Sequence, residues 1–241
     1  MRLFGLIGRP LGHSLSAAYF TGKFGREGID AEYRAFELPD IEAIADLPEN
    51  IEGFNVTIPY KRAVIPYLDA LSPEAEAIGA VNCVLCRNGR RTGYNTDVAG
   101  IRRSIDLLTG EDTIDGALVL GSGGASAAVQ YVLAERGIPF AIVSRDPVRG
   151  NLTYEDLNAG IVAESRLIIN TTPVGMYPNV DAAPELPYNA IDGRHLLFDL
   201  VYNPRITRFL ELGRKAGACT MDGVTMFHEQ AEASWRIWNS D

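Results

Sequence analysis

The stretch that most constrains the fold of this chain is a short apolar run that ends in glycines. It reads Ala117-Leu-Val-Leu-Gly-Ser-Gly-Gly-Ala-Ser126, and the following residues, 127–136, favour a helix. Glycines allow a sharp turn and let a bulky anion approach backbone N–H groups, and a helix N-terminus adds unpaired donors and partial positive charge. The pattern predicts a pyrophosphate-binding turn. An ordinary glycine-rich turn remains the alternative, because Ser126 replaces the third glycine of G-x-G-x-x-G.

Further apolar runs extend this unit into a sheet. Residues 140–144, 167–170 and 196–200 are continuous apolar segments, which are typical of parallel strands buried on both faces. We therefore predict an α/β fold with a Rossmann-type, doubly wound parallel sheet over residues 98–222. A smaller α/β domain is expected over residues 1–97, and the C-terminal segment, 223–241, is expected to form a helix that packs back on it.

Composition and charge exclude several classes of protein. The chain has 241 residues and a net charge of −9, which disfavours nucleic acid or an anionic membrane as a partner. It has no apolar run near the roughly 20 residues that a membrane span needs and no export signal, so a cytoplasmic location is expected. Cys83 and Cys86 form C-x-x-C within a predicted strand and face opposite sides of it. We interpret them as buried free thiols and expect no metal site.

Polar residues gather at particular places in the first domain. Strand alternation puts Asn55 and Thr57 on one face, and Ser14 and Ser16 are likewise two residues apart. Hydroxyl and amide groups in this pattern favour a polar, polyhydroxylated ligand. The alternative is a solvated sheet face with serines in turns.

Lys61 and Asp97 are the candidates for proton transfer. Pro59 suits the first position of a helix, which would put Lys61 in a first helical turn, where the helix dipole disfavours a cation. That placement favours a functional role over a solvent-facing lysine. Asp97 begins a predicted helix, so an N-cap is its alternative role. Brought together in a cleft, the two would form a proton-transfer pair.

Eight motifs occur in an order that resembles the shikimate dehydrogenase family over essentially the whole chain. They are Gly8-Arg-Pro-Leu-Gly-His-Ser-Leu-Ser16, Gly53-Phe-Asn-Val-Thr-Ile-Pro-Tyr-Lys61, Gly79-Ala-Val-Asn82, Gly93-Tyr-Asn-Thr-Asp97, Gly121-Ser-Gly-Gly-Ala125, Asn170-Thr-Thr-Pro-Val-Gly-Met176, Asp199-Leu-Val-Tyr-Asn-Pro204 and Asp222-Gly-Val-Thr-Met226 with Gln230-Ala231. The resemblance implies a substrate domain, a nucleotide domain and the reversible NADPH-dependent reduction of 3-dehydroshikimate to shikimate, a step in aromatic amino-acid biosynthesis.

The resemblance also assigns roles to individual residues. Lys61 and Asp97 match the family's catalytic pair. The implied substrate-binding residues are Ser14, Ser16, Asn55, Thr57, Asn82, Tyr202 and Gln230. The implied cofactor-binding residues are Gly121, Ser122, Gly123, Gly124, Ala125, Ser144, Arg145, Arg149, Thr172, Gly223 and Met226, with the nicotinamide near the last two.

Two departures from the family pattern leave questions open. Ala17, Tyr19 and Phe20 stand where the family has proline and His-Asn, which affects helix packing. Asp146 follows Arg145 at the end of the second nucleotide strand, so an acid that suits NAD competes with the arginines that suit the 2′-phosphate of NADP. We predict NADP over NAD.

Two alternative functions remain, namely a quinate/shikimate dehydrogenase of relaxed substrate and cofactor use and a non-catalytic metabolite-binding relative. For the assembly, we expect either a monomer or a homodimer.

Overall fold

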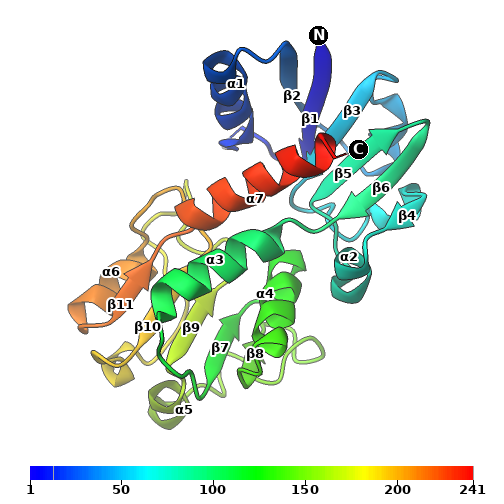
Figure 1. The fold of residues 1–241 in the computed structure, drawn as a ribbon. Helices are drawn as coiled ribbons and strands as arrows, with labels where there is room; N and C mark the ends of the chain where they lie inside the picture. The colour runs from blue at the N-terminus through cyan, green and yellow to red at the C-terminus, as the bar shows by residue number, and fades with distance from the viewer. Residues whose placement is uncertain (13, 241) are drawn as a thin grey trace. The chain divides into compact units, whose positions relative to one another are not determined.

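The chain folds into two compact units in a computed structural model, which describes residues 1–12 and 14–240. Unit 1 comprises Met1–Thr96 together with Ala231–Asp241, and unit 2 comprises Asp97–Gln230. The division falls within the last helix, α7 (Val224–Trp238), so this one helix contributes to both units (Figure 1). A helix was predicted in this C-terminal segment, and the structure confirms it.

Unit 1 is built on a mixed sheet in the order β2-β1-β3-β5-β6-β4. Its strands are β1 (Arg2–Gly8), β2 (Ala31–Glu37), β3 (Ile51–Val56), β4 (Ala70–Leu71), β5 (Cys83–Arg87) and β6 (Arg90–Tyr94). Strand β1 pairs in parallel with β2 and β3, whereas β5 pairs antiparallel with β3 and β6. Asn88 and Gly89 join β5 to β6 with φ values of 53° and 71°, the left-handed backbone of a tight hairpin turn. An Asn-Gly pair is itself a strong sequence signal for such a hairpin.

Each face of this sheet has its own apolar core. Along β1, Leu3 and Ile7 point to one face, which is covered by η1 (Glu42–Asp46), η2 (Ile65–Tyr67) and α2 (Pro73–Ile78). Phe4 and Leu6 point to the other face, which is covered by α1 (Ser16–Glu27) and the end of α7. Trp238 anchors α7 there, because its Nε1 donates to the carbonyl of Val84 at 3.0 Å.

The helix predicted from Pro59 onward is wrong. Residues 58–64 form consecutive turns, and a regular 3₁₀ helix begins only at Ile65. The carbonyl of Lys61 accepts a hydrogen bond of 2.7 Å from the backbone N–H of Val81, not from a residue one helical turn later. This long-range bond takes the acceptor that an α-helix would need. No helix dipole therefore acts against the charge of Lys61 from its own segment.

Unit 2 contains a sheet whose five strands all run parallel, in the order β11-β10-β9-β7-β8. The strands are β7 (Ala117–Leu120), β8 (Phe140–Val143), β9 (Leu167–Asn170), β10 (Leu196–Asp199) and β11 (Cys219–Met221). The helical segments around them are α3 (Asp97–Thr109), α4 (Gly124–Glu135), α5 (Ala159–Glu164), η3 (Tyr188–Ala190) and α6 (Arg208–Lys215) (Figure 1). This sheet confirms the predicted doubly wound α/β class. Its strand order reverses between β7 and β9, where such folds bind ligands beyond the carboxyl ends of the strands.

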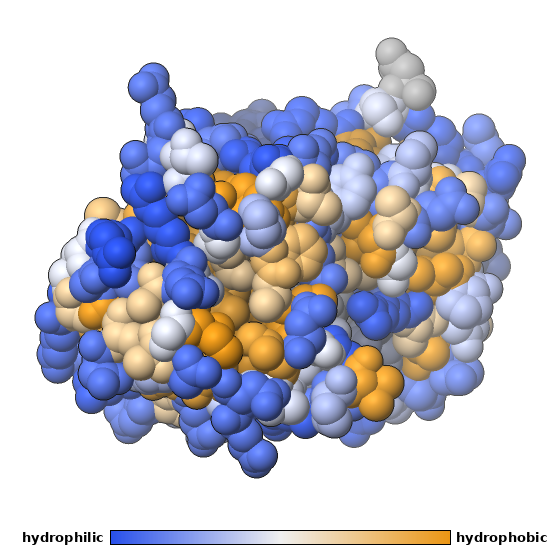
Figure 2. Space-filling view, turned by 90° about the horizontal axis from the view of Figure 1, so that it is seen from below, coloured by the Kyte–Doolittle hydropathy of each residue, from blue (hydrophilic) through white to orange (hydrophobic). Residues whose placement is uncertain are grey.

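No helix in the described part of the chain is long and apolar enough to cross a membrane. Figure 2 shows a face on which hydrophilic residues surround smaller groups of apolar ones.

Cys83 is buried and Cys86 partly buried, and both thiols are free. Burial raises the pKa of the Cys83 thiol to about 12 and that of Cys86 to about 11, so both remain protonated and unreactive near neutral pH.

Candidate functional site

One edge of the unit 1 sheet collects most of the polar residues singled out in the sequence. The parallel strands β1 and β3 both end there, β5 begins there and β6 ends there. The backbone N–H of Thr57 donates to the carbonyl of Ile7 at 2.9 Å, which joins the segments that follow β3 and β1. Ser14 lies in the loop after β1, where its Oγ accepts from the N–H of Ser16 at 3.3 Å. His13, in the same motif, lies outside the described residues.

Asn55 is buried and held by protein partners at this edge. Its Oδ1 accepts from the hydroxyl of Tyr33 at 2.8 Å. Its Nδ2 donates to the carbonyl of Asn82 at 3.1 Å and to Oγ of Ser234 at 2.9 Å. Both amide hydrogens are therefore used within unit 1, so Asn55 positions its neighbours in this structure.

Asn82 has a fixed amide orientation. Its Oδ1 accepts from the backbone N–H of Thr96 at 2.6 Å and from the Thr96 hydroxyl at 3.1 Å. Because both hydrogen bonds from Thr96 hold the amide oxygen, the amide nitrogen of Asn82 points away from Thr96 and acts as a donor. Thr96 immediately precedes Asp97, so the same bonds order the chain that leads to that carboxylate.

The two candidates for proton transfer begin from well-ordered backbone. Lys61 is tied to Val81 by the 2.7 Å backbone bond, next to Asn82. Asp97 is a buried first residue of α3. The division into units puts Lys61 in unit 1 and Asp97 in unit 2. Their proton-transfer role remains a prediction.

The glycine-rich turn of unit 2 lies at the point where the strand order reverses. Gly121 directly follows β7 and has φ 107°, a value that side chains rarely allow. A Cβ there would lie 2.7 Å from Oγ1 of Thr171 and 2.9 Å from Cγ2 of Thr172, so only glycine lets this turn lie against the segment after β9. A Cβ on Gly123, by contrast, would meet nothing within 4 Å. Open space thus lies over the start of α4, where helix N–H groups suit a pyrophosphate.

Ser126 explains the missing third glycine of the motif. It is fully buried in the first turn of α4, and its hydroxyl donates to the carbonyl of Gly121 at 2.7 Å. Gln130, one helical turn further on, donates to the same hydroxyl at 2.9 Å. The serine therefore ties the helix to the turn, which a third glycine could not do.

The loop after β8 carries the residues expected to select the cofactor. Oγ of Ser144 lies 3.0 Å from Oγ of Ser122, which links this loop to the glycine turn. Asp146 accepts from the N–H of Val148 at 3.0 Å through one oxygen, and the other lies 3.3 Å from Nε of Arg149. Burial raises the pKa of Tyr154, and the positive charge of Arg145 opposes that rise. Both oxygens of Asp146 are thus engaged within the loop, and both arginines lie close to it in sequence.

A second network, which the sequence motifs do not reveal, orders the segment after β9. Oδ1 of Asn170 accepts from the N–H of Thr172 at 3.0 Å and from its hydroxyl at 2.6 Å. Nδ2 of Asn170 donates to Asp199 at 3.0 Å. The sequence motifs implied a cofactor-binding role for Thr172 and none for Asp199. The pairing of β9 with β10 is what brings these residues together.

The remaining predicted residues lie around the start of α7. A Cβ on Gly223 would collide with the backbone carbonyl of Leu200, so glycine is required there by close packing. Met226 is buried against Gly100 of α3. Tyr202 packs its ring 5.0 Å from that of Phe227, and Gln230 donates to the carbonyl of Phe227 at 3.0 Å. Phe227 is therefore a common neighbour of two predicted substrate residues.

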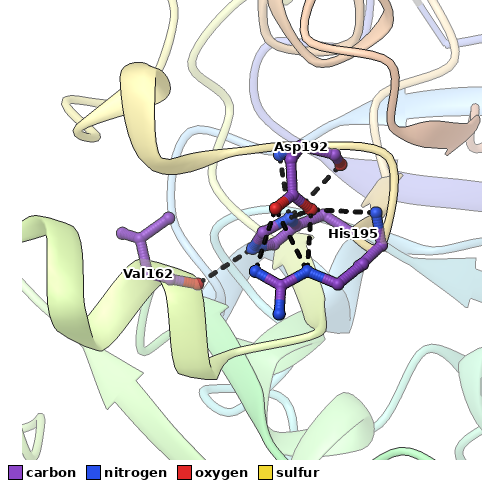
Figure 3. A network of polar contacts seen from close by, with 4 residues as sticks. Val162, Asp192 and His195 are labelled. Carbon is purple, nitrogen blue, oxygen red and sulfur yellow. Dashed lines mark hydrogen bonds and ion pairs between the residues drawn. The ribbon is translucent and has the colours of Figure 1, made fainter.

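A histidine–aspartate pair in unit 2, in which the histidine is fully buried and the aspartate half exposed, resembles a catalytic pair (Figure 3). Nε2 of His195 lies 3.1 Å from the carbonyl of Val162, and Nδ1 lies 3.0 Å from both the N–H and Oδ1 of Asp192. The neighbouring Arg194 lowers the pKa of Asp192, as do its backbone N–H and His195. His195 directly precedes β10, whereas ligands of parallel sheets bind beyond the carboxyl ends. We therefore interpret the pair as a structural contact at the amino end of β10.

Among the described residues no group of three or more acidic, histidine or cysteine side chains is arranged to hold a metal.

The strand order and the glycine turn at its reversal place unit 2 among the dinucleotide-binding α/β folds. Residues 6–84 match the family model of the shikimate dehydrogenase substrate binding domain. Shikimate dehydrogenase (NADP(+)) of Methanococcus maripaludis strain C6 is 36% identical over 255 residues, which cover 98% of this chain and 91% of that protein. The chain therefore belongs to the shikimate dehydrogenase family.

Solved structures agree with this assignment. Shikimate 5-dehydrogenase of Thermus thermophilus, in complex with NADP(H) and shikimate, superposes with a TM-score of 0.86 at 33% identity. The match covers 99% of this chain and 94% of that one. Quinate dehydrogenase of Corynebacterium glutamicum, in complex with NAD, superposes with a TM-score of 0.88 at 27% identity over 99% of this chain and 93% of that one.

Proposed function

We propose that the protein catalyses the reversible NADPH-dependent reduction of 3-dehydroshikimate to shikimate, a step in aromatic amino-acid biosynthesis. The observation that carries the proposal is the near-full-length match to relatives named shikimate dehydrogenase (NADP(+)). Two features of the chain support it. Unit 1 gathers hydroxyl and amide groups at one sheet edge, and unit 2 has open space over the helix that follows its glycine turn.

We assign unit 1 to the substrate and unit 2 to the cofactor. Hydroxyl and amide groups hold the carboxylate and hydroxyls of shikimate, and each unmade hydrogen bond in such a site disfavours an analogue that lacks the group. The proposed substrate-binding residues are Ser14, Ser16, Asn55, Thr57, Asn82, Tyr202 and Gln230. The hydrogen bonds of Asn55 to Tyr33 and Ser234 add a supporting role for that residue.

Lys61 is the proposed proton donor, and Asp97 its partner. When NADPH is bound, it supplies the hydride that reduces the ring ketone. Lys61 then gives a proton to the alkoxide oxygen, and in the reverse direction it takes the proton from the hydroxyl. Asp97 orients the reacting hydroxyl. Placement and charge are what the chain itself contributes.

The residues of unit 2 fit NADP. The N-terminal turn of α4 with Gly121, Ser122, Gly123, Gly124 and Ala125 suits the pyrophosphate. Arg145 and Arg149 suit the 2′-phosphate, with Ser144 beside them. The ion pair of Arg149 with Asp146 is exposed, with side chains 67% and 50% accessible, and exposed pairs are weak. A dianionic phosphate therefore competes well for Arg149. Thr172, Gly223 and Met226 complete the proposed cofactor site.

A second candidate is a quinate/shikimate dehydrogenase that also accepts NAD. The similarity to the quinate dehydrogenase of Corynebacterium glutamicum favours it, as does an acid at position 146. A non-catalytic metabolite-binding relative is less well supported, because both Lys61 and Asp97 are present. The proposal includes a cytoplasmic location and either a monomer or a homodimer.

One steady-state experiment tests these proposals. Formation of reduced nicotinamide is followed by its absorbance with shikimate or quinate and with NADP or NAD, which makes four combinations. The proposed function requires the highest kcat/KM with shikimate and NADP. Comparable values with quinate or NAD would establish the second candidate, and no turnover in any combination would leave the non-catalytic relative.

A further inference from the structure

A continuous chain of buried hydrogen bonds crosses unit 1 from β2 to the end of β6. Its members are Tyr33, Asn55, Ser234, Thr96 and Asn82, and each is at most 6% exposed. Ser234 is fully buried on α7 and lies in the middle of the chain, 138 residues from Thr96 in sequence. It lies 2.9 Å from Nδ2 of Asn55 and 3.1 Å from Oγ1 of Thr96.

The chemistry of the groups allows only one direction for this chain. Nδ2 of Asn55 donates to the carbonyl of Asn82, which can only accept, so the Asn55 amide is fixed and its second hydrogen goes to Ser234. At the other end, the Thr96 hydroxyl gives its single hydrogen to Oδ1 of Asn82. The hydroxyl of Ser234 therefore donates to Thr96, and the Cys83 thiol, which burial keeps protonated, is the donor in its own hydrogen bond with Ser234.

The direction has a consequence for Asn82. Two bonds from Thr96 hold its amide oxygen, and one of them depends on the Thr96 hydroxyl, which Ser234 orders. With its oxygen held, Asn82 presents its nitrogen as a donor, so it recognises an oxygen that accepts. A carboxylate, a ketone and the lone pair of a hydroxyl all qualify.

We infer that Ser234 is a positioning residue for shikimate: it connects α7 to Asn55 and Thr96 and thereby holds Asn82 in its donor orientation. The inference rests on the proposed function, because it takes Asn82 to be a substrate residue. Ser234 itself touches neither substrate nor cofactor in this role. Its removal should weaken the recognition of shikimate and leave the site in unit 2 unaffected.

The test measures the KM for shikimate and the KM for NADP in Ser234→Ala. One lost buried hydrogen bond should raise the KM for shikimate by about three- to tenfold, while the KM for NADP stays within about twofold, in the usual range for a site without contact to the change. Ser234→Thr keeps the hydroxyl and should restore most of the wild-type KM. Ser104→Ala is the matched control, because Ser104 is another fully buried helical serine whose hydroxyl has no hydrogen-bond partner among the described residues.

Other outcomes would overturn the inference. An unchanged KM for shikimate in Ser234→Ala, or an equal rise in both KM values, would make the serine merely structural, even if the thermal midpoint falls. Thr96→Val breaks the chain one link further along and should give the same selective change, so it decides the matter if Ser234→Ala does not fold. Absence of shikimate turnover in the wild-type protein would instead refute the proposed function.

Discussion

Replacing Asp199 by asparagine should remove a specific pH dependence from the stability of unit 2. The Asp199 side chain is fully buried at the end of β10. It accepts hydrogen bonds from the N–H of Val201 at 3.0 Å, Nδ2 of Asn170 at 3.0 Å and the hydroxyl of Thr207 at 2.5 Å. Burial nevertheless dominates these bonds and raises the pKa of the carboxyl from 3.8 to about 6.

The magnitude follows from the difference between the folded and unfolded pKa. Between pH 3.8 and about 6 the native state holds a proton that the unfolded state has released. The free energy of unfolding therefore falls by up to about 1.4 kcal/mol per pH unit in this window. The total comes to about 3 kcal/mol. This stabilisation is fully present below pH 3.8 and lost above about pH 6. Asparagine does not titrate, so Asp199→Asn lacks this term.

Amide hydrogen exchange of β9 and β10 provides the assay, measured from pH 4.5 to 7.5 and corrected for intrinsic exchange rates. It reports on these strands directly, whereas both tryptophans lie in the part of α7 that belongs to unit 1. The opening free energy of the wild-type strands should fall relative to Asp199→Asn as pH rises to about 6. Asp156→Asn serves as the control, because hydrogen bonds from Thr153 lower the pKa of this exposed carboxyl below 3.8, so its removal should not alter the pH dependence in this range. Parallel pH profiles for wild type and Asp199→Asn would refute the reasoning.

Three further substitutions test the site and the fold. Lys61→Ala should lower kcat by about 10²- to 10⁴-fold with little change in KM, since a proton donor is lost. Arg62→Ala, at the exposed neighbouring residue, is the control. If Lys61→Ala has a kcat as high as that of Arg62→Ala, Lys61 is not the proton donor. Arg145→Ala should raise the KM for NADP and leave that for NAD nearly unchanged, whereas a parallel rise would mean that the arginine does not contact the 2′-phosphate. Gly53→Ala should lower the thermal midpoint by several degrees, because its Cβ would collide with the indole of Trp238. An unaltered midpoint would contradict that packing.

The parts of the fold that local patterns determine could be predicted from the sequence. Continuous apolar runs predicted β7, β9 and β10, because a strand that is buried on both faces has apolar residues at successive positions and no alternation with polar ones. The Asn88-Gly89 pair is a local signal for the hairpin, because both residues tolerate positive φ. The glycine turn before α4 was recognised for the same reason.

Long-range hydrogen bonds explain what the sequence did not predict. The bond between Lys61 and Val81 diverts the backbone after β3 from a helix, and no nearby residue signals it. Ser234 and Thr96 are ordinary polar residues until α7 packs on unit 1. The raised pKa of Asp199 likewise depends on burial, which a motif does not reveal. In each case the signal lies in residues that are distant in sequence.

The path of α7 also has consequences for how the protein is made. Unit 2 is continuous from Asp97 to Gln230, whereas the core of unit 1 is completed only by Trp238, stacked 4.8 Å from Phe4. About 140 residues separate the end of the first segment of unit 1 from Trp238, so at roughly 5–20 residues per second a ribosome needs about 7–30 s to supply it. During that interval the aromatic face formed by Phe4, Phe20 and Phe24 has no cover from α7. The core of unit 1 can thus be completed only after unit 2 has been synthesised, and we expect the uncovered aromatic face to be a binding site for chaperones in the meantime.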